Sequence, residues 1–198
     1  MLQKSEFRSL NAAFRVEPIT HKNIAIIEHV DKLIEREFPK HGAPLHFLLS
    51  TLPVAGAYDP LLEDNLYNNC LQYWAFLDKN SSTCAATCGI FLMQKDHENT
   101  LWAGWLVLAP EFRKQGLGKQ LIAFVLDFCK EYGNIHGHST LQFLTSDEPH
   151  VQSARNLYAL IGSKEARSFP NPYVPGSNAI VMQWPIPREE QEFMPLAS

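Results

Sequence analysis

The sequence has no apolar stretch long enough to cross a bilayer. Its longest apolar run, Leu101 to Pro110, is about half of the ~20 residues that a membrane-spanning helix needs, so it predicts a buried strand. The first residues, Met1 to Asn11, are charged and lack the apolar core that a signal peptide requires. The sequence therefore predicts a cytoplasmic protein that does not associate with membranes.

Cysteine is scarce, and positive charge is not clustered. The formal net charge of -4 and the absence of a basic stripe argue against a nucleic-acid partner. A single C-x3-C pair without a second pair at metal-ligand spacing argues against a metal site, and zinc bound by these cysteines is the alternative. The cysteines are expected to be reduced residues of the core or of strands: Cys70, Cys84, Cys88 and Cys129.

Internal repeats and low-complexity linkers are also absent. A chain of 198 residues with 45% hydrophobic content is long enough to bury one substantial core. We therefore expect a single domain over residues 1–198, with a loose N-terminal extension at 1–12 and a polar tail at 188–198. Both a monomer and a homodimer are compatible with this composition.

The hydrophobic periodicity predicts a mixed α/β (α+β) protein. Strand-like runs separated by polar turns indicate an antiparallel meander, with helical patterns before and after it. The expected strands are Phe14–Ile19, Gln72–Asp78, Cys84–Gln94, Thr100–Leu108, Thr140–Thr145 and Ala179–Trp184. The expected helices are a segment capped by Thr20 and ended by Pro39 and Gly42, Asp59–Asn69, a segment from Leu117 that Gly133 ends, and Val151–Ile161.

A glycine-bearing turn, Arg113 to Lys119, connects the last strand of the meander to an amphipathic helix. It does not fit a Walker loop, since position 113 is not glycine and position 120 is neither serine nor threonine. Leu121 stands where the dinucleotide fingerprint has its third glycine. Gly116 and Gly118 instead open a helix, where unblocked N–H groups converge on an anion and the helix dipole favours it by roughly 0.3 to 1 kcal/mol. The turn predicts a pyrophosphate site; the alternative is that the glycines only make a tight bend.

The segment from Leu106 to Lys119 resembles motif A of the GNAT acetyltransferase superfamily. The signature of that motif, Q/R-x-x-G-x-G/A, follows a strand and opens a helix. Arg113, Gly116 and Gly118 match its three fixed positions. The resemblance implies acetyl-coenzyme A (acetyl-CoA) as the co-substrate and no metal cofactor.

A second segment, Ala154 to Gly162, is similar to the family's A-x-x-L-Y-x-x-x-G helix. It departs from the pattern at Val151, where asparagine is frequent, and at Ser163, where phenylalanine often follows the glycine. Together the two segments imply the GNAT fold, which is a mixed, mostly antiparallel central sheet flanked by helices, with splayed central strands.

The resemblance also implies roles for individual residues. Backbone groups of Leu106, Val107 and Leu108 are expected to pair with the pantetheine arm, and an N–H of Val107 or Leu108 to polarise the thioester carbonyl. Tyr158 is expected to be the general acid for the departing thiolate, since a phenol of pKa ~10 can protonate a thiolate of pKa ~8.5; otherwise it is an ordinary half-buried residue. The pyrophosphate is expected to bind Arg113, Lys114, Gln115, Gly116, Leu117, Gly118 and Lys119.

The general base and the acceptor pocket have several candidates. Deprotonation of the amine is open to four loop residues and to water, and each of the four is otherwise a solvated side chain: Glu98, Asp147, Glu148 and His150. The resemblance places His41 and His46 near the acceptor, and it makes the proline-rich loop Phe169–Asn178 an acceptor-side lid. Aromatic strand residues either line the pocket or belong to the core: Tyr73, Trp74, Phe76, Trp102 and Trp105.

These patterns predict an N-acetyltransferase that moves an acetyl group from acetyl-CoA to a primary amine by direct attack in a ternary complex. The acceptor is expected to be a small molecule or a peptide. The alternative is a regulatory domain of the same fold that binds acyl-CoA without turnover, since the sequence shows no clear general base.

Overall fold

The computed structural model describes residues 14–20, 22–39, 69–93, 99–172 and 174–188. Its seven strands form one sheet in the order β1-β2-β3-β4-β5-β7-β6. Within these residues β4 and β5 pair in parallel, and every other neighbouring pair is antiparallel. The predicted mixed, mostly antiparallel sheet is confirmed.

The sequence periodicity located most elements to within a few residues. The strands are β1 (Phe14–Pro18), β2 (Asn69–Asp78), β3 (Cys84–Leu92), β4 (Thr100–Leu108), β5 (Thr140–Ser146), β6 (Lys164–Pro170) and β7 (Asn178–Pro185). The helices are α1 (Ile24–Glu37), α3 (Leu117–His136) and α4 (Gln152–Leu160), with 3₁₀ turns η3 (Pro110–Phe112) and η4 (Pro149–Val151). The helix expected at 59–69 lies outside the described residues, apart from Asn69, where β2 begins.

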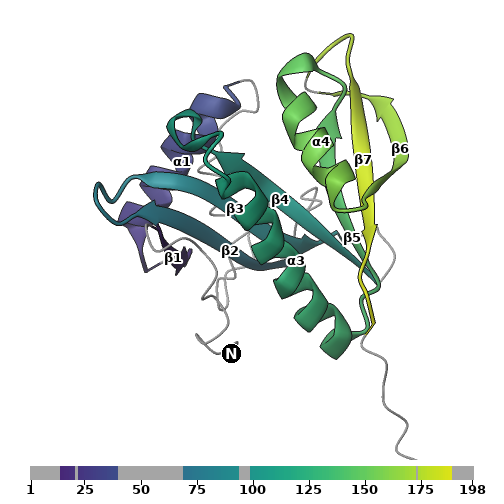
Figure 1. Cartoon of the computed structure of the whole chain (residues 1–198), viewed down its shortest axis with the longest axis horizontal. Coiled ribbons are helices and arrows are strands. Elements are labelled where there is room, and N and C mark those ends of the chain that lie inside the picture. The colour runs from purple at the N-terminus through teal and green to yellow at the C-terminus, as the bar shows by residue number, and fades with distance from the viewer. Residues whose placement is uncertain (1–13, 21, 40–68, 94–98, 173, 189–198) are drawn as a thin grey trace, which may run out of the picture.

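The helices cover the two faces of the sheet unequally. Figure 1 shows α3 and α4 in front of the strands and α1 behind them. Alternation along β2 divides the core accordingly: Trp74 and Phe76 pack on the α3 side, whereas Tyr73 and Leu77 pack on the α1 side. No helix in the described ranges is long and apolar enough to cross a bilayer.

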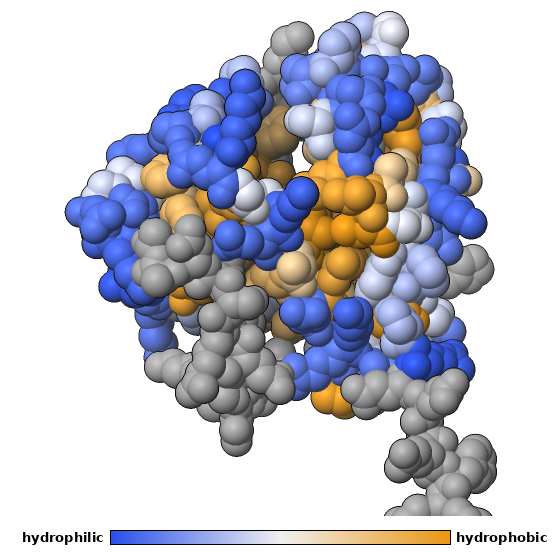
Figure 2. All heavy atoms as spheres, in the orientation of Figure 1, coloured by the Kyte–Doolittle hydropathy of each residue, from blue (hydrophilic) through white to orange (hydrophobic). Residues whose placement is uncertain are grey.

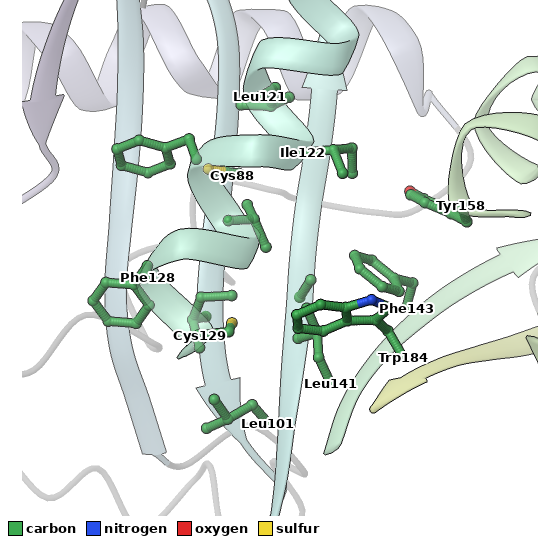
Figure 3. Close-up of a cluster of buried hydrophobic side chains, with 14 of the residues drawn as sticks. Cys88, Leu101, Leu121, Ile122, Phe128, Cys129, Leu141, Phe143, Tyr158 and Trp184 are labelled. Atoms are coloured by element: carbon green, nitrogen blue, oxygen red, sulfur yellow. The ribbon is translucent and has the colours of Figure 1, made fainter. Parts of the chain in front are cut away.

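The larger core lies between α3, α4 and the sheet. Buried side chains of α3, including Ile122 and Cys129, meet Leu141 and Phe143 of β5 and Trp184 of β7 (Figure 3). Burying one such large apolar side chain contributes about 1.5–3 kcal/mol. The amphipathic stripe of α3 therefore fixes this helix, and with it the turn that precedes it, against β4 and β5.

Two predicted helix boundaries are wrong. Asn23, and not Thr20, is the N-cap of α1: the Asn23 carbonyl accepts from the N–H groups of Ile26 and Ile27 at 3.0 and 3.2 Å, while its side chain turns back to accept from the Thr20 N–H at 2.8 Å. Gly133 does not end α3, which continues to His136 and is ended by Gly137 at a φ of 81°. At Gly133 a Cβ would lie 2.9 Å from the His138 carbonyl oxygen, so this glycine allows a close approach of the following chain.

The strand β6 was not predicted. All of its residues are exposed, so it lacks the apolar alternation that reveals a half-buried strand. It lies at the edge of the sheet beside β7 and includes Phe169 and Pro170. The expected loop Phe169–Asn178 is thus shorter, because its first two residues belong to β6 and Asn178 begins β7.

Candidate active site

The strands β4 and β5 separate halfway along their length. Their pairing runs from Thr100 and Thr140 to Ala103 and Phe143 and then stops. Beyond this point β4 stays with β3, while β5 continues along β7 as far as Ser146. The sheet therefore opens towards the carboxyl ends of β4 and β5, as predicted for splayed central strands.

A bulge in β4 lies at the point of divergence. Between the pairs Gly89–Gly104 and Thr87–Val107, β4 has one residue more than β3. Trp105, inside this bulge, has a φ of 50°, and its ring packs edge-on against that of Phe38, which follows α1, at 5.8 Å. A bulge bends its own strand, so it directs the end of β4 away from β5.

The bulge also decides which groups of β4 face the opening. The Ala109 N–H donates to the Ala85 carbonyl of β3 at 2.9 Å. Since alternate residues of a strand bond to the same neighbour, Val107 also turns its N–H and C=O towards β3, and Leu108 turns its own towards the opening. Of the two donors predicted for the thioester carbonyl, only the Leu108 N–H is therefore directed at the gap.

The turn between β4 and α3 leaves its amides open. Lys114 and Gly116 have φ angles of 61° and 83°, and Gly116 is the N-cap of α3. The N–H groups of residues 114–118 have no acceptor among the described residues, whereas the Gly116 carbonyl accepts from Lys119 and Gln120 at 3.1 and 3.3 Å. A Cβ on Gly116 would meet no atom within 4 Å. These are the conditions for binding an anion.

The side chains of the turn divide into three groups. Leu117 is buried in the core. Arg113 and Gln115 fold back onto the protein: Arg113 donates to the Leu108 carbonyl at 3.1 and 3.0 Å and pairs with Glu37, and Gln115 donates to the Glu111 carbonyl at 2.9 Å. Two exposed cations make no ion pair with a described residue and are directed at solvent around the turn: Lys114 and Lys119.

The helix α4 brings Tyr158 to the same opening. Its ring is buried and stacks on Phe143 of β5 with a centroid distance of 4.6 Å and an interplanar angle of 19°. Figure 3 shows its oxygen pointing from α4 towards Ile122 of α3. Burial raises the pKa of Tyr158 to about 12, and its hydroxyl makes no hydrogen bond to a described residue. The phenol is therefore protonated at physiological pH, as a free phenol is, and the raised pKa makes it a weaker acid than a free phenol.

The turn and α4 are adjacent. A Cβ on Gly118 would lie 3.6 Å from Leu157 of α4 and 3.8 Å from Leu108 of β4, which is ordinary contact. Figure 2 shows apolar side chains gathered in a hollow in the middle of this face of the molecule. An elongated ligand held at the turn thus has an apolar path towards Tyr158 and the divergence of β4 and β5.

The sequence profile of the acetyltransferase (GNAT) family matches residues 31–162, which include the turn, both diverging strands and α4. The chain belongs to this family. No curated protein matches it.

Solved structures share this GNAT fold at low sequence identity. The ribosomal-protein-S18-alanine N-acetyltransferase from Escherichia coli superposes with a TM-score of 0.60 at 16% identity, over 90% of this chain and 97% of that chain. The NatC complex bound to Gag peptide and CoA gives 0.60 at 16%, over 88% and 99%. The aminoglycoside 6'-N-acetyltransferase from Enterococcus faecium gives 0.61 at 15%, over 89% and 99%.

The candidate bases of the GNAT chain are not equally available. Glu98, like His41 and His46, lies outside the described residues. Both carboxylate oxygens of Asp147 accept from Asn178, at 2.9 and 2.8 Å, and these backbone and side-chain hydrogen bonds lower the pKa of Asp147. Asp147 therefore acts as a link between β5 and β7.

Glu148 and His150 lie just beyond the end of β5. Glu148 accepts from the Ser146 hydroxyl at 3.0 Å and lies 3.8 Å from the exposed His150 ring. Both follow the carboxyl end of β5, the end towards which β4 and β5 separate.

Most of the aromatic candidates belong to the GNAT core. Trp74 and Phe76 pack edge-on against Phe124 of α3, at 5.1 and 5.3 Å. Tyr73 is buried in the cluster that contains α1, Trp102 is buried against Phe91 and Val181, and Trp105 is only half buried. The core interpretation holds for Trp74 and Phe76, whose rings are covered by α3.

The sequence did not reveal the part that two residues play in the site. Trp105 is predicted as a pocket or core aromatic and not as part of a bulge, although the glycine beside it in a strand is a signal for one. Nothing in the sequence around Glu37 indicates a role in the site, because its partner Arg113 is far away along the chain. Within the described ranges no group of three or more His, Cys, Asp or Glu residues is placed to hold a metal ion.

Proposed function

We propose that this chain transfers the acetyl group of acetyl-CoA to a primary amine by direct attack in a ternary complex. The observation that carries the proposal is the run of outward N–H groups at residues 114–118, beside the divergence of β4 and β5. A pyrophosphate at these groups leads the pantetheine arm along β4 to Tyr158. The NatC structure, which shares the fold, is bound to CoA.

Each step of the transfer can then be assigned to a chemical group of this chain or to water. The amides of the turn, with Lys114 and Lys119, bind the pyrophosphate, and the backbone of Leu106 and Leu108 binds the pantetheine, since Val107 is paired with β3. The amine lone pair attacks the thioester carbon while the Leu108 N–H stabilises the oxyanion. The C–S bond breaks, and the thiolate takes the Tyr158 proton. The amine loses its own proton to water or to a carboxylate, and the phenolate regains a proton.

Buried cysteines favour direct attack over an acyl-enzyme. Burial raises the pKa of Cys84 to about 12 and raises the pKa of Cys88 and Cys129 further. A thiol is nucleophilic only as the thiolate, so these three do not serve as acyl carriers. The same burial confirms their interpretation as reduced core or strand residues.

The amine reaches the thioester from the face opposite to α3 and α4. The cofactor occupies the α3 and α4 side, so the α1 side is left for the acceptor. Structures that share the fold include enzymes for an alanine of a ribosomal protein and for an aminoglycoside. We therefore propose a small-molecule or peptide amine as acceptor.

A matched pair of glycine variants tests the proposal. Gly116 and Gly137 have nearly the same φ, 83° and 81°, and a Cβ on either meets nothing within 4 Å. Alanine at either position costs about 1 kcal/mol of backbone strain. Only Gly116→Ala adds its methyl group among the open amides, where it competes with the pyrophosphate for space, and the loss of one charge-assisted hydrogen bond weakens acetyl-CoA binding by about tenfold.

Calorimetric titration with acetyl-CoA measures this difference. Gly137→Ala should bind like the parent after the same loss of thermal stability. Equal affinities for the two variants, or no binding by the parent, would refute the proposed site. Release of free thiol with a panel of amines then separates the enzyme from a domain that binds acyl-CoA without turnover.

A further inference from the structure

The turn that carries the open amides is not held by its own backbone. Hydrogen bonds from Phe112 to Ala109 and from Arg113 to Pro110 close the preceding 3₁₀ turn, and helical bonding resumes at Lys119. Between them the chain contains left-handed residues at 114 and 116. Such a conformation persists only when surrounding contacts enforce it, so the restraint comes from the flanking side chains.

Those side chains attach the turn to the end of α1. Arg36 and Glu37 occupy the last turn of that helix, and Glu111 and Arg113 flank the start of the open segment. Arg113 pairs with Glu37, Arg36 donates to both carboxylate oxygens of Glu111 at 3.4 and 3.2 Å, and Arg36 Nε donates to Glu37 at 3.2 Å. We call these four residues the charge quartet. Figure 1 shows the start of α3 beside α1 at this end of the sheet.

Glu37 occupies a position that its own helix disfavours. A carboxylate in the last turn faces the negative end of the helix dipole, which costs about 0.3–1 kcal/mol at an exposed site. Here the side chain of Glu37 is only 14% exposed and contacts two guanidinium groups. The Arg113 guanidinium in turn donates twice to the carbonyl of Leu108. Glu37 thus fixes Arg113 against the end of β4.

We infer that Glu37 is a positioning residue for the coenzyme: through Arg113 it keeps the N–H groups of residues 114–118 directed outward for the pyrophosphate. This inference rests on the proposed function, since it assumes that acetyl-CoA binds at the turn. Arg113 then acts indirectly and does not contact the pyrophosphate, because its guanidinium group is bonded to Glu37 and to the Leu108 carbonyl. Its role is to hold the turn from the face of the sheet opposite to α3.

Glu37→Gln distinguishes positioning from simple electrostatics, because the two predict opposite signs. Removing a carboxylate near a polyanion, and releasing Arg113 to approach it, strengthens binding if only Coulomb attraction matters. A turn that loses its restraint binds more weakly, by about tenfold if one amide to phosphate bond is lost. Glu17→Gln is the charge-matched control, since Glu17 pairs with Arg15 on β1 at 3.0 Å, away from the turn.

The measurements are the calorimetric affinity for acetyl-CoA and, with an amine that the parent acetylates, the separate KM and kcat. We expect Glu37→Gln to raise KM for acetyl-CoA with kcat at saturation retained, Glu37→Asp to recover part of the affinity, and Glu17→Gln to match the parent. Arg113→Gln should weaken binding similarly, and the double variant with Glu37→Gln no further. General destabilisation would instead reduce the active fraction and hence kcat.

The outcomes separate the two proposals. If the parent binds no acetyl-CoA, the proposed function fails. If the parent binds and Glu37→Gln binds equally or more tightly, the positioning role fails while the function stands. If Glu37→Gln does not fold, Glu37→Asp takes its place in the test. The inference is contradicted if Glu37→Asp binds acetyl-CoA as tightly as the parent and Arg113→Gln has the same effect on affinity in both backgrounds.

Discussion

Tyr158→Phe tests the environment of the proposed general acid without reference to a substrate. Burial raises the pKa of Tyr158 from 10.0 to about 12, so the folded protein retains a proton that the unfolded chain loses above pH 10. A raised pKa in the folded state gives stability that is fully present below the unfolded pKa and is lost as pH rises through the folded pKa. Two pKa units correspond to about 3 kcal/mol.

Replacing the phenol by a phenyl ring removes this dependence. The hydroxyl has no hydrogen bond to a described residue, so Tyr158→Phe should change the free energy of unfolding by less than about 1 kcal/mol at pH 8. Between pH 10 and 12 the parent should lose up to about 3 kcal/mol relative to the variant. The difference between the two, measured by urea unfolding at each pH, isolates this one group.

Absorbance titration of tyrosinate gives an independent measure. In the folded parent, Tyr158 should titrate near pH 12, and Tyr158→Phe should lower the absorbance change at this pH by the contribution of one tyrosine. Tyr132→Phe, which also removes a hydroxyl from a ring stacked on a phenylalanine, reports the effect of losing any phenol. A constant stability difference from pH 8 to 12, with no late titration step, would show that the Tyr158 ring is hydrated.

The same variant has a kinetic consequence. A positioned general acid contributes typically ~10²–10⁴-fold to a rate. Tyr158→Phe should therefore lower kcat by that order while the affinity for acetyl-CoA changes less than about twofold. Loss of affinity with unchanged kcat would make Tyr158 a binding residue instead.

Two further predictions concern packing. Gly133→Ala should destabilise the fold by about 1 kcal/mol although alanine has the better helix propensity, because its Cβ would lie 2.9 Å from the His138 carbonyl oxygen and 3.2 Å from Ile186. Thermal unfolding measures this change, and a variant more stable than the parent would contradict the close contact. In a Cys70→Ser background, the three remaining thiols should stay unmodified by a thiol reagent until denaturant is added, since all are buried; labelling of the native protein at the rate of a free thiol would contradict their burial.

The sequence was sufficient for elements whose hydrophobic pattern is strong. The stripe of α3 follows from burial on one side of the helix, and the apolar run of β2 follows from burial on both faces of the sheet, so both are visible in the sequence. Gly116 was recognised from its place in a turn that opens a helix, and the structure adds that its backbone is left-handed, with a φ of 83°. The strand β6 is exposed along its whole length and therefore has no apolar alternation, so the sequence did not predict it.

The geometry of the opening was accessible only as a resemblance. The residues Thr100–Leu108 do not by themselves show that pairing with β5 stops at Ala103. The end of this pairing depends on a bulge in β4, which exists only relative to the neighbouring strand β3. Long-range side-chain pairs are hidden for the same reason. Arg113 alone is an ordinary surface cation, and its partner is known only once α1 is placed beside the turn.

The bulge at Trp105 and the open turn are two parts of one arrangement. A regular β4 would continue beside β5, and its backbone groups would be used in the sheet, leaving none for a ligand. The bulge frees the groups of Leu108 on that side, and Arg113 then occupies its carbonyl but leaves its N–H. The sheet thus lacks a stretch of pairing at the place where a thioester needs a hydrogen-bond donor. Residues at the end of α1 contact both ends of this stretch: Phe38, just after the helix, packs on Trp105, and Glu37 pairs with Arg113. Loss of either α1 contact should therefore disturb the cofactor groups although α1 lies on the opposite face of the sheet.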